Sequence, residues 1–190
     1  MISLIGNRPA LQIGRYQVIE YDTAWLDLAL RRAAIAAEVE DFPFVEDIRS
    51  GVVQYLETKC PLKLLPLEEL FERMRKMLIK IGCDHIAAKL APLAPPVTVS
   101  LVRAAMQAGN GFELAFFETL RLELTALRAA GAEEIRFSGL RESLLILRGT
   151  EKWNRHCESL QAEIEGFLST WSRDAQPRPQ AVAACIENLS

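Results

Sequence analysis

A proline-rich segment, Ala91-Pro92-Leu93-Ala94-Pro95-Pro96, divides the chain near its middle. Proline cannot continue a helix because it lacks the backbone amide and its ring clashes with the preceding turn. Apolar residues recur every three or four positions before this segment, whereas β-branched residues cluster in Val97–Val102 after it. The pattern predicts an α+β protein with a helical module over residues 1–91, a sheet-containing module over residues 97–172 and a C-terminal tail over residues 173–190.

The first module is expected to be mostly helical. The pattern predicts short strands over residues 11–15 and 17–21, then helices over residues 23–38, 44–58 and 66–81, and a further turn or two from Asp84. Asp22 can cap the first helix, and Gly82 is placed to end the third. Gly51 weakens the second helix by up to about 1 kcal/mol relative to alanine, which suggests close packing against a neighbour. Residues 61–66 are expected to form a linker.

An apolar stripe along the third helix defines the predicted core of this module. The stripe includes Leu70, Phe71, Met74 and Leu78. These side chains are expected to pack against apolar residues of the first two helices, namely Trp25, Leu28 and Val52.

The second module is predicted to be a small sheet with helices on one face, in the order βαββα. Strands are expected over residues 97–102, 134–138 and 143–147, the last two joined by a hairpin over residues 139–142. Helices are expected over residues 112–130 and 151–171, the second capped by Thr150, with a short helix over residues 180–189. Most of the sheet should therefore follow Pro96.

Composition and charge restrict the expected partners. The 190-residue chain has a formal net charge of −3, which gives no reason to expect nucleic acid as a partner. No apolar run approaches the roughly 20 residues that span a bilayer, so we expect no membrane association. The first residues lack the basic start and long apolar region of a signal peptide, and the four cysteines follow no repeating spacing. We therefore expect a cytoplasmic protein with reduced thiols.

Two stretches of the first module carry a family resemblance. Val18-Ile19-Glu20-Tyr21-Asp22 leads into a helix over residues 26–34, and Pro66–Leu70 begins another that continues through Leu78–Gly82 to Ile86-Ala87. The pattern resembles the ATP-cone, a small nucleotide-binding regulatory module attached to ribonucleotide reductases and found in the repressor of their genes. The resemblance covers residues 11–90, under half of the chain, and implies a regulatory function with ATP or dATP as ligand.

The N-terminal hairpin departs from the family pattern. Family cones hold the phosphates with two adjacent basic residues there, and alignment on Tyr21-Asp22 puts Ile13 and Gly14 at those positions. Arg15 is one position away, and Tyr16 replaces the turn glycine. The resemblance therefore implies a degenerate phosphate-binding hairpin, and we expect weak or absent ATP or dATP binding.

Basic side chains of the first module are the candidate nucleotide ligands: Arg15, Arg31, Arg73, Lys76 and Lys80. The last three share one face of the predicted third helix, and phosphate binding needs converging cations. The alternative is an ordinary solvated face, in which neighbours such as Glu72 and Lys76 face each other.

The sequence contains no catalytic signature. Gly-x-Ser-x-Gly, the Walker loop and Gly-x-Gly-x-x-Gly are all missing from it, so no catalytic residue is predicted and a small hydrolase or transferase is disfavoured. Cys83 with His85, and His156 with Cys157, have poor spacing for zinc, so no metal is expected. The leading hypothesis is a non-catalytic regulatory or ligand-sensing module. The alternative is a protein-interaction or self-associating scaffold without a small-molecule ligand.

Overall fold

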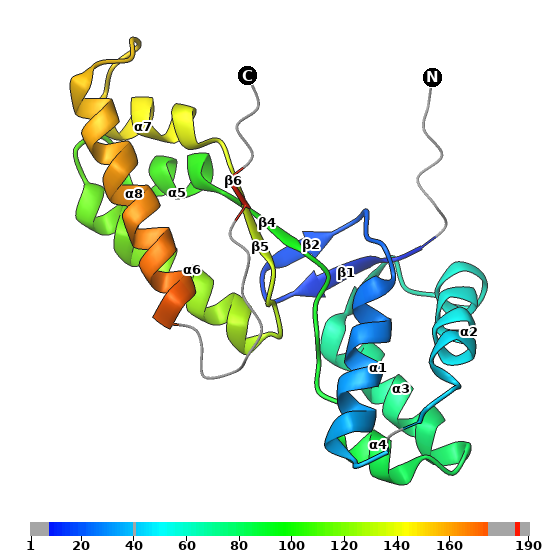
Figure 1. The fold of residues 1–190 in the computed structure, drawn as a ribbon. Coiled ribbons are helices and arrows are strands. Elements are labelled where there is room, and N and C mark those ends of the chain that lie inside the picture. Colours follow the sequence, from blue (N-terminus) through cyan, green and yellow to red (C-terminus); the bar gives the residue numbers. More distant parts are fainter. Residues whose placement is uncertain (1–7, 40, 175–184, 187–190) are drawn as a thin grey trace. The chain divides into compact units, whose positions relative to one another are not determined.

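The chain has an α+β fold in the computed structural model, which describes residues 8–39, 41–174 and 185–186 (Figure 1). The predicted fold class is confirmed. The fold divides into two compact units, each with its own helices and strands. Unit 1 comprises Met1–Pro95 with Ala129–Ala132, and unit 2 comprises Pro96–Arg128 with Glu133–Ser190.

In its described residues, unit 1 combines a three-stranded sheet with four helices. The strands are β1 (Ala10–Ile13), β2 (Tyr16–Val18) and β3 (Leu64–Pro66), in the order β2-β1-β3. The pairing of β1 is antiparallel with β2 and parallel with β3. The helices are α1 (Ala24–Ala36), α2 (Val45–Thr58), α3 (Leu67–Lys80) and α4 (Asp84–Lys89).

The ends of these elements follow local sequence signals. Gly14, at φ 57°, turns the chain between β1 and β2. The Asp22 carboxylate accepts a hydrogen bond of 3.0 Å from the Ala24 amide at the start of α1. Gly82, at φ 81°, follows the end of α3. The predicted hairpin, the three principal helices and the short helix from Asp84 are confirmed.

The predicted linker before the third helix contains a strand instead. Leu64–Pro66 forms β3, which pairs with β1 through Leu11 and Leu65, and both of these side chains are fully buried. Pro66 fits because β3 lies at the edge of the sheet, where a missing amide is tolerated. The expectation that most of the sheet follows Pro96 is therefore wrong, since both units contain a three-stranded sheet.

The core of unit 1 lies where α3 meets α1, α2 and the sheet. The predicted stripe of α3 is confirmed as buried: Leu70, Phe71, Met74 and Leu78 are each at most 2 % exposed. The ring centroids of Trp25 and Phe71 lie 6.1 Å apart. Leu28 was assigned to this core wrongly, because it is 39 % exposed while Leu26 and Leu30 are fully buried.

Unit 2 is built on a sheet in which all the described pairings are parallel. Its strands, in the order β4-β5-β6, are β4 (Val97–Ser100), β5 (Ile135–Ser138) and β6 (Cys185–Ile186). Its helices are α5 (Leu101–Ala108), α6 (Glu113–Ala129), α7 (Leu140–Arg148) and α8 (Arg155–Asp174). α5 packs beside α7, and a contact between the Phe117 and Phe167 rings, with centroids 5.3 Å apart, joins α6 to α8 (Figure 1).

The predicted strand over residues 143–147 and its hairpin are wrong, because Leu140–Arg148 is helix α7. The buried side chains of α7 are Leu140, Ser143, Leu144 and Leu147, a helical spacing. The second module is therefore not βαββα. The predicted strand over residues 97–102 also ends early, because the Ser100 hydroxyl accepts a 3.4 Å hydrogen bond from the Arg103 amide and α5 begins at Leu101.

The last helix begins later than expected. The side chain of Asn154, rather than that of Thr150, accepts hydrogen bonds of 3.0 and 3.1 Å from the amides of His156 and Cys157. In the predicted helix over residues 180–189, Cys185–Ile186 is strand β6 instead, and the other residues lie outside the described part of the chain.

Tyr21 predicts a pH dependence of stability in unit 1. Its hydroxyl donates a 2.9 Å hydrogen bond to the Pro9 carbonyl. Burial raises the pKa of Tyr21 above its ordinary value of 10.0, and the Arg8 charge opposes this shift. A raised pKa in the folded state means that the stabilising contribution is complete below the unfolded pKa and is lost as the pH rises through the folded one. The free energy of unfolding should therefore decline above about pH 10.

The Tyr21→Phe variant should lose this part of the alkaline decline. Urea denaturation of both proteins between pH 8 and pH 11 measures it. An equal decline in the variant and the parent protein would show that Tyr21 does not contribute.

Candidate functional site

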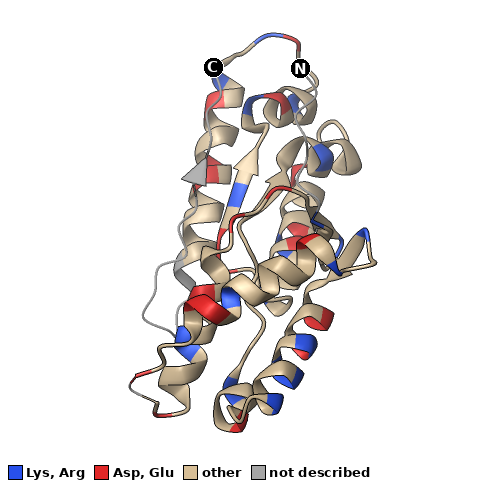
Figure 2. Cartoon of the chain, turned by 90° about the vertical axis from the view of Figure 1, so that its right-hand side faces the viewer, with Lys and Arg blue, Asp and Glu red and all other residues tan. Residues whose placement is uncertain are grey.

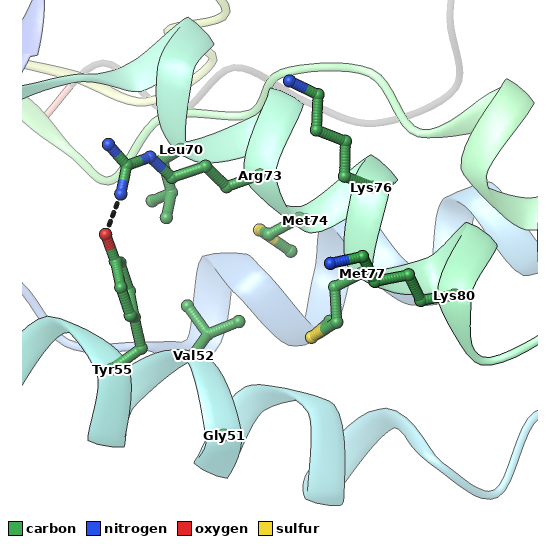
Figure 3. A pocket seen from close by; sticks show the side chains of 9 residues that line it. All are labelled: Gly51, Val52, Tyr55, Leu70, Arg73, Met74, Lys76, Met77 and Lys80. Atoms are coloured by element: carbon green, nitrogen blue, oxygen red, sulfur yellow. Dashed lines mark hydrogen bonds between the residues drawn. The ribbon is translucent and has the colours of Figure 1, made fainter. Parts of the chain in front are cut away.

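A pocket lies between α2 and α3 in unit 1 (Figure 3). Its volume of about 450 Å³ is within the range of roughly 300–1,000 Å³ that ligand pockets usually occupy. The lining side of α2 consists of Gly51, Val52 and Tyr55, and the lining side of α3 consists of Leu70, Arg73, Met74, Lys76, Met77 and Lys80. These positions recur every three or four residues, so each set occupies one side of its helix.

The inner wall of the pocket is apolar. Val52, Leu70 and Met74 are 5 %, 1 % and 2 % exposed, so the pocket reaches the core of unit 1. Met77 is half-buried nearer the opening. A ligand that inserts an apolar part here removes that part from water at the same time as it covers these side chains.

The opening of the pocket carries positive charge that the neighbouring acids do not neutralise. Lys76 and Lys80 are exposed, and neither has an ion-pair partner among the described residues. Glu72, which shares their helix, is bound to Arg75. Basic and acidic residues are otherwise interspersed on the helices (Figure 2). The described lining of the pocket includes three cationic side chains and no Asp or Glu.

Arg73 is held across the opening by two partners. Its Nη1 donates to the hydroxyl of Tyr55, as drawn in Figure 3, and its Nε donates to Glu69 over 3.2 Å. Its guanidinium carbon lies 5.5 Å from the centroid of the Tyr55 ring. Arg73 therefore connects α3 to α2, and Glu69 offsets part of its charge.

The structure places three of the five candidate nucleotide ligands in this pocket. Arg73, Lys76 and Lys80 line it together, whereas Arg15 and Arg31 do not. Arg15 is exposed in the turn between β1 and β2, with its guanidinium carbon 6.0 Å from the Tyr16 ring centroid, and Arg31 is exposed on α1.

Sequence reasoning identified the cationic side of the pocket and missed the opposite side. Tyr55 and Met77 were not predicted as site residues. The spacing of Gly51 and Tyr55, one turn apart on α2, was a usable signal, because a glycine beside an aromatic side chain on one helical face leaves space at that face. Gly51 was expected to permit close helix packing. A Cβ built on it would have no heavy atom within 4 Å, so the expectation is wrong and Gly51 instead leaves the pocket open.

Gly51→Ala should raise the free energy of unfolding by about 0.5–1 kcal/mol, because alanine is the better helix former and the added methyl meets no neighbour. Urea denaturation measures the change. Gly166→Ala in α8 is the matched control, since a Cβ there also meets nothing within 4 Å and should bring a similar gain. A loss of stability in the Gly51 variant alone would show that α2 needs this glycine.

Other observations on the chain do not assign a function. Within the described residues, no group of three or more His, Cys, Asp or Glu is placed to hold a metal ion. None of the helices in the described ranges combines the length and hydrophobicity needed to cross a bilayer. No protein-family model, curated protein or solved structure matches the chain. The pocket between α2 and α3 is therefore the feature that bears most directly on function.

Proposed function

We propose that unit 1 is a non-catalytic ligand-sensing module that binds a small organic anion between α2 and α3. The observation that carries the proposal is the position of Lys76 and Lys80 at the opening of a pocket with a buried apolar wall. Neither lysine has an ion-pair partner among the described residues. An anion there interacts with both ammonium groups beside a low-dielectric interior, where charge pairing is stronger than in bulk water.

The lining residues support binding rather than chemistry. General acid–base catalysis most often employs His, and also Asp, Glu, Cys, Lys or Tyr; of these the described lining contains only Tyr55 and the exposed Lys76 and Lys80. The titratable groups that are present, namely Tyr55, Arg73 and the two lysines, are suited to holding a negative charge in place.

The contacts of Arg73 would couple ligand binding to the packing of the helices. An anion at the opening competes with Tyr55 for the Arg73 guanidinium, and that hydrogen bond joins α2 to α3. Elsewhere on α2, Arg49 forms a 2.7 Å ion pair with Asp27 of α1. These two contacts connect α3 to α2 and α2 to α1. A ligand in the pocket would therefore change the first contact in this series of three helices.

ATP and dATP belong to the proposed class of ligand, and the resemblance to the ATP-cone supports testing them. Their phosphates could pair with Lys76 and Lys80. The hairpin pair that family members use is replaced here by Ile13 and Gly14, so we propose that any nucleotide site is degenerate.

Thermal unfolding with a panel of organic anions tests the proposed function. A ligand present at one hundred times its dissociation constant should stabilise the folded state by about 2.7 kcal/mol. The panel should contain ATP, dATP, decanoate, decyl phosphate and citrate, with inorganic phosphate as the reference. We expect at least one organic anion to raise the melting temperature of the parent protein and to have little effect on the Lys76→Gln/Lys80→Gln variant. No shift with any anion, or equal shifts in both proteins, would contradict the proposal.

A second candidate function is self-association or protein binding through unit 2. Three large apolar side chains at the end of α5 and the start of α6 favour it, since Met106, Phe112 and Leu114 are 69 %, 65 % and 86 % exposed. Exposed apolar groups of this kind can mark interaction surfaces. Light scattering should then give a mass above that of one chain, and Met106→Ser/Leu114→Ser should restore the monomer mass. A monomeric parent protein would exclude self-association.

A further inference from the structure

The apolar side chains that line the α2–α3 pocket provide no hydrogen-bonding group for a polar ligand. Leu70 and Val52 are aliphatic, and Met74 and Met77 are unbranched thioethers that adapt their shape to a neighbour. Methionine-rich surfaces of this kind fit flexible hydrocarbon chains, which need contact area rather than directed hydrogen bonds.

The only uncharged polar side chain in the described lining is Tyr55, and its hydroxyl already accepts a hydrogen bond from Arg73. The Tyr55 O–H is then the one uncharged donor that the described lining can offer, and a nucleobase buried here would leave most of its ring nitrogens and exocyclic groups without matched partners. Buried polar groups without partners weaken binding strongly. A hydrocarbon chain has no such groups.

The charged end of the ligand can be placed as well. Lys76 and Lys80 are one helical turn apart on α3, and both line the pocket with exposed side chains. In Figure 3 the ammonium group of Lys80 lies beside Met77, whereas that of Lys76 points away from α2. Arg73 lies at the same opening, already oriented by Glu69 and Tyr55. A compact anionic head is therefore matched to the opening, with its chain directed toward Val52 and Leu70.

We propose that the pocket binds a single-chain anionic amphiphile, with an unbranched alkyl or acyl chain on the apolar wall and a phosphate or carboxylate head beside Lys76 and Lys80. This inference rests on the proposed function and narrows it to one class of organic anion. It also distinguishes the ligand from a nucleoside triphosphate, whose apolar part is a hydrogen-bonding base.

Titration calorimetry of the full chain with hexyl, octyl and decyl phosphate, each below its micelle concentration, tests the proposal. The affinity should rise about fourfold with each added methylene, the ratio that corresponds to about 0.8 kcal/mol per buried CH₂. Inorganic phosphate and ATP should bind more weakly than decyl phosphate. Decanoate separates the two heads, because binding as tight as that of decyl phosphate means that charge rather than phosphate geometry is recognised.

Two substitutions at Gly51 test whether the alkyl chain of the ligand lies in the pocket. Gly51→Phe places a ring in the open space of the pocket and should weaken decyl phosphate binding at least about tenfold, because the ring takes the volume of the chain. Gly51→Ala adds one methyl and should change the affinity less than about threefold. Circular dichroism of both variants verifies that the helices are retained.

Three results would overturn the inference. Affinity that does not depend on chain length, or ATP binding tighter than decyl phosphate, would exclude an amphiphile and leave the proposed anion-sensing function standing. If the affinity depends on alkyl chain length but is equal in Gly51→Phe and Gly51→Ala, the alkyl chain binds elsewhere on the protein. Absence of binding by every anion, including those of the thermal panel, would remove the inference and the proposed function together.

Discussion

Replacing Leu78 by alanine should lower the free energy of unfolding of unit 1 by about 2–5 kcal/mol. The side chain is fully buried at the C-terminal end of the α3 stripe, so truncation removes buried methyl groups and leaves a cavity. Urea denaturation measures the change, with the fluorescence of Trp25 as the signal for unit 1. Trp25 is 5 % exposed and packs against Phe71. The other two tryptophans are removed by Trp153→Phe and Trp171→Phe, so that only Trp25 contributes.

The neighbouring residue supplies the control. Ile79 is on the same helix but 51 % exposed, and Ile79→Ala should change the free energy of unfolding by less than about 0.5 kcal/mol. Similar losses in the two variants would mean that the effect does not depend on burial in the core. A loss below about 0.5 kcal/mol for Leu78→Ala would show that the stripe does not hold unit 1 together.

Removing both lysine charges at the pocket should weaken binding of an organic anion at least about a hundredfold, because charged hydrogen bonds contribute about 1.5–3 kcal/mol each. The variant is Lys76→Gln/Lys80→Gln, which keeps side-chain size and polarity. Titration calorimetry with decyl phosphate at low and high salt measures the loss. The affinity of the parent protein should also fall as salt rises, since the two ammonium groups are exposed.

Lys89→Gln on α4 is the matched control for this prediction. Lys89 is exposed in the same unit but does not line the pocket, and its substitution lowers the net charge of unit 1 by one. The control should bind within about threefold of the parent protein, since a remote exposed charge is largely screened. Equal losses in the control and in the double variant would trace the effect to net charge rather than to the pocket.

The parts of the fold that the sequence predicted are those with a long local period. The α3 stripe from Leu70 to Leu78 repeats over several turns, so its helix and its buried face follow from the sequence. Leu140–Arg148 is a short leucine-rich run whose length suits a strand as well as a helix, and only the tertiary packing of Leu144 and Leu147 decides for the helix. Strand β3 cannot be recognised from its own residues, because it is stabilised by pairing with β1, which is distant in sequence.

Part of the candidate site could likewise be predicted from the sequence, and part could not. The cationic side of the pocket was predictable, because Arg73, Lys76 and Lys80 lie on one helix and their spacing alone brings them to one face. The pocket itself was not, because its depth depends on how far α2 stands from α3. Gly51 illustrates the difficulty, since a glycine within a helix can indicate either close packing or open space, and only the distance to the neighbouring atoms distinguishes the two.

The central claim is that an organic anion binds between α2 and α3. The NMR signals of the methionine methyl groups test this claim most directly. Met74 and Met77 line the pocket, whereas Met106 is 69 % exposed on α5 of unit 2 and serves as an internal control. Met74→Leu and Met77→Leu assign the two signals. On titration with decyl phosphate, and separately with ATP, the signals of Met74 and Met77 should shift with the binding anion while that of Met106 stays in place. Unchanged Met74 and Met77 signals under both ligands, or a shift confined to Met106, would contradict the claim.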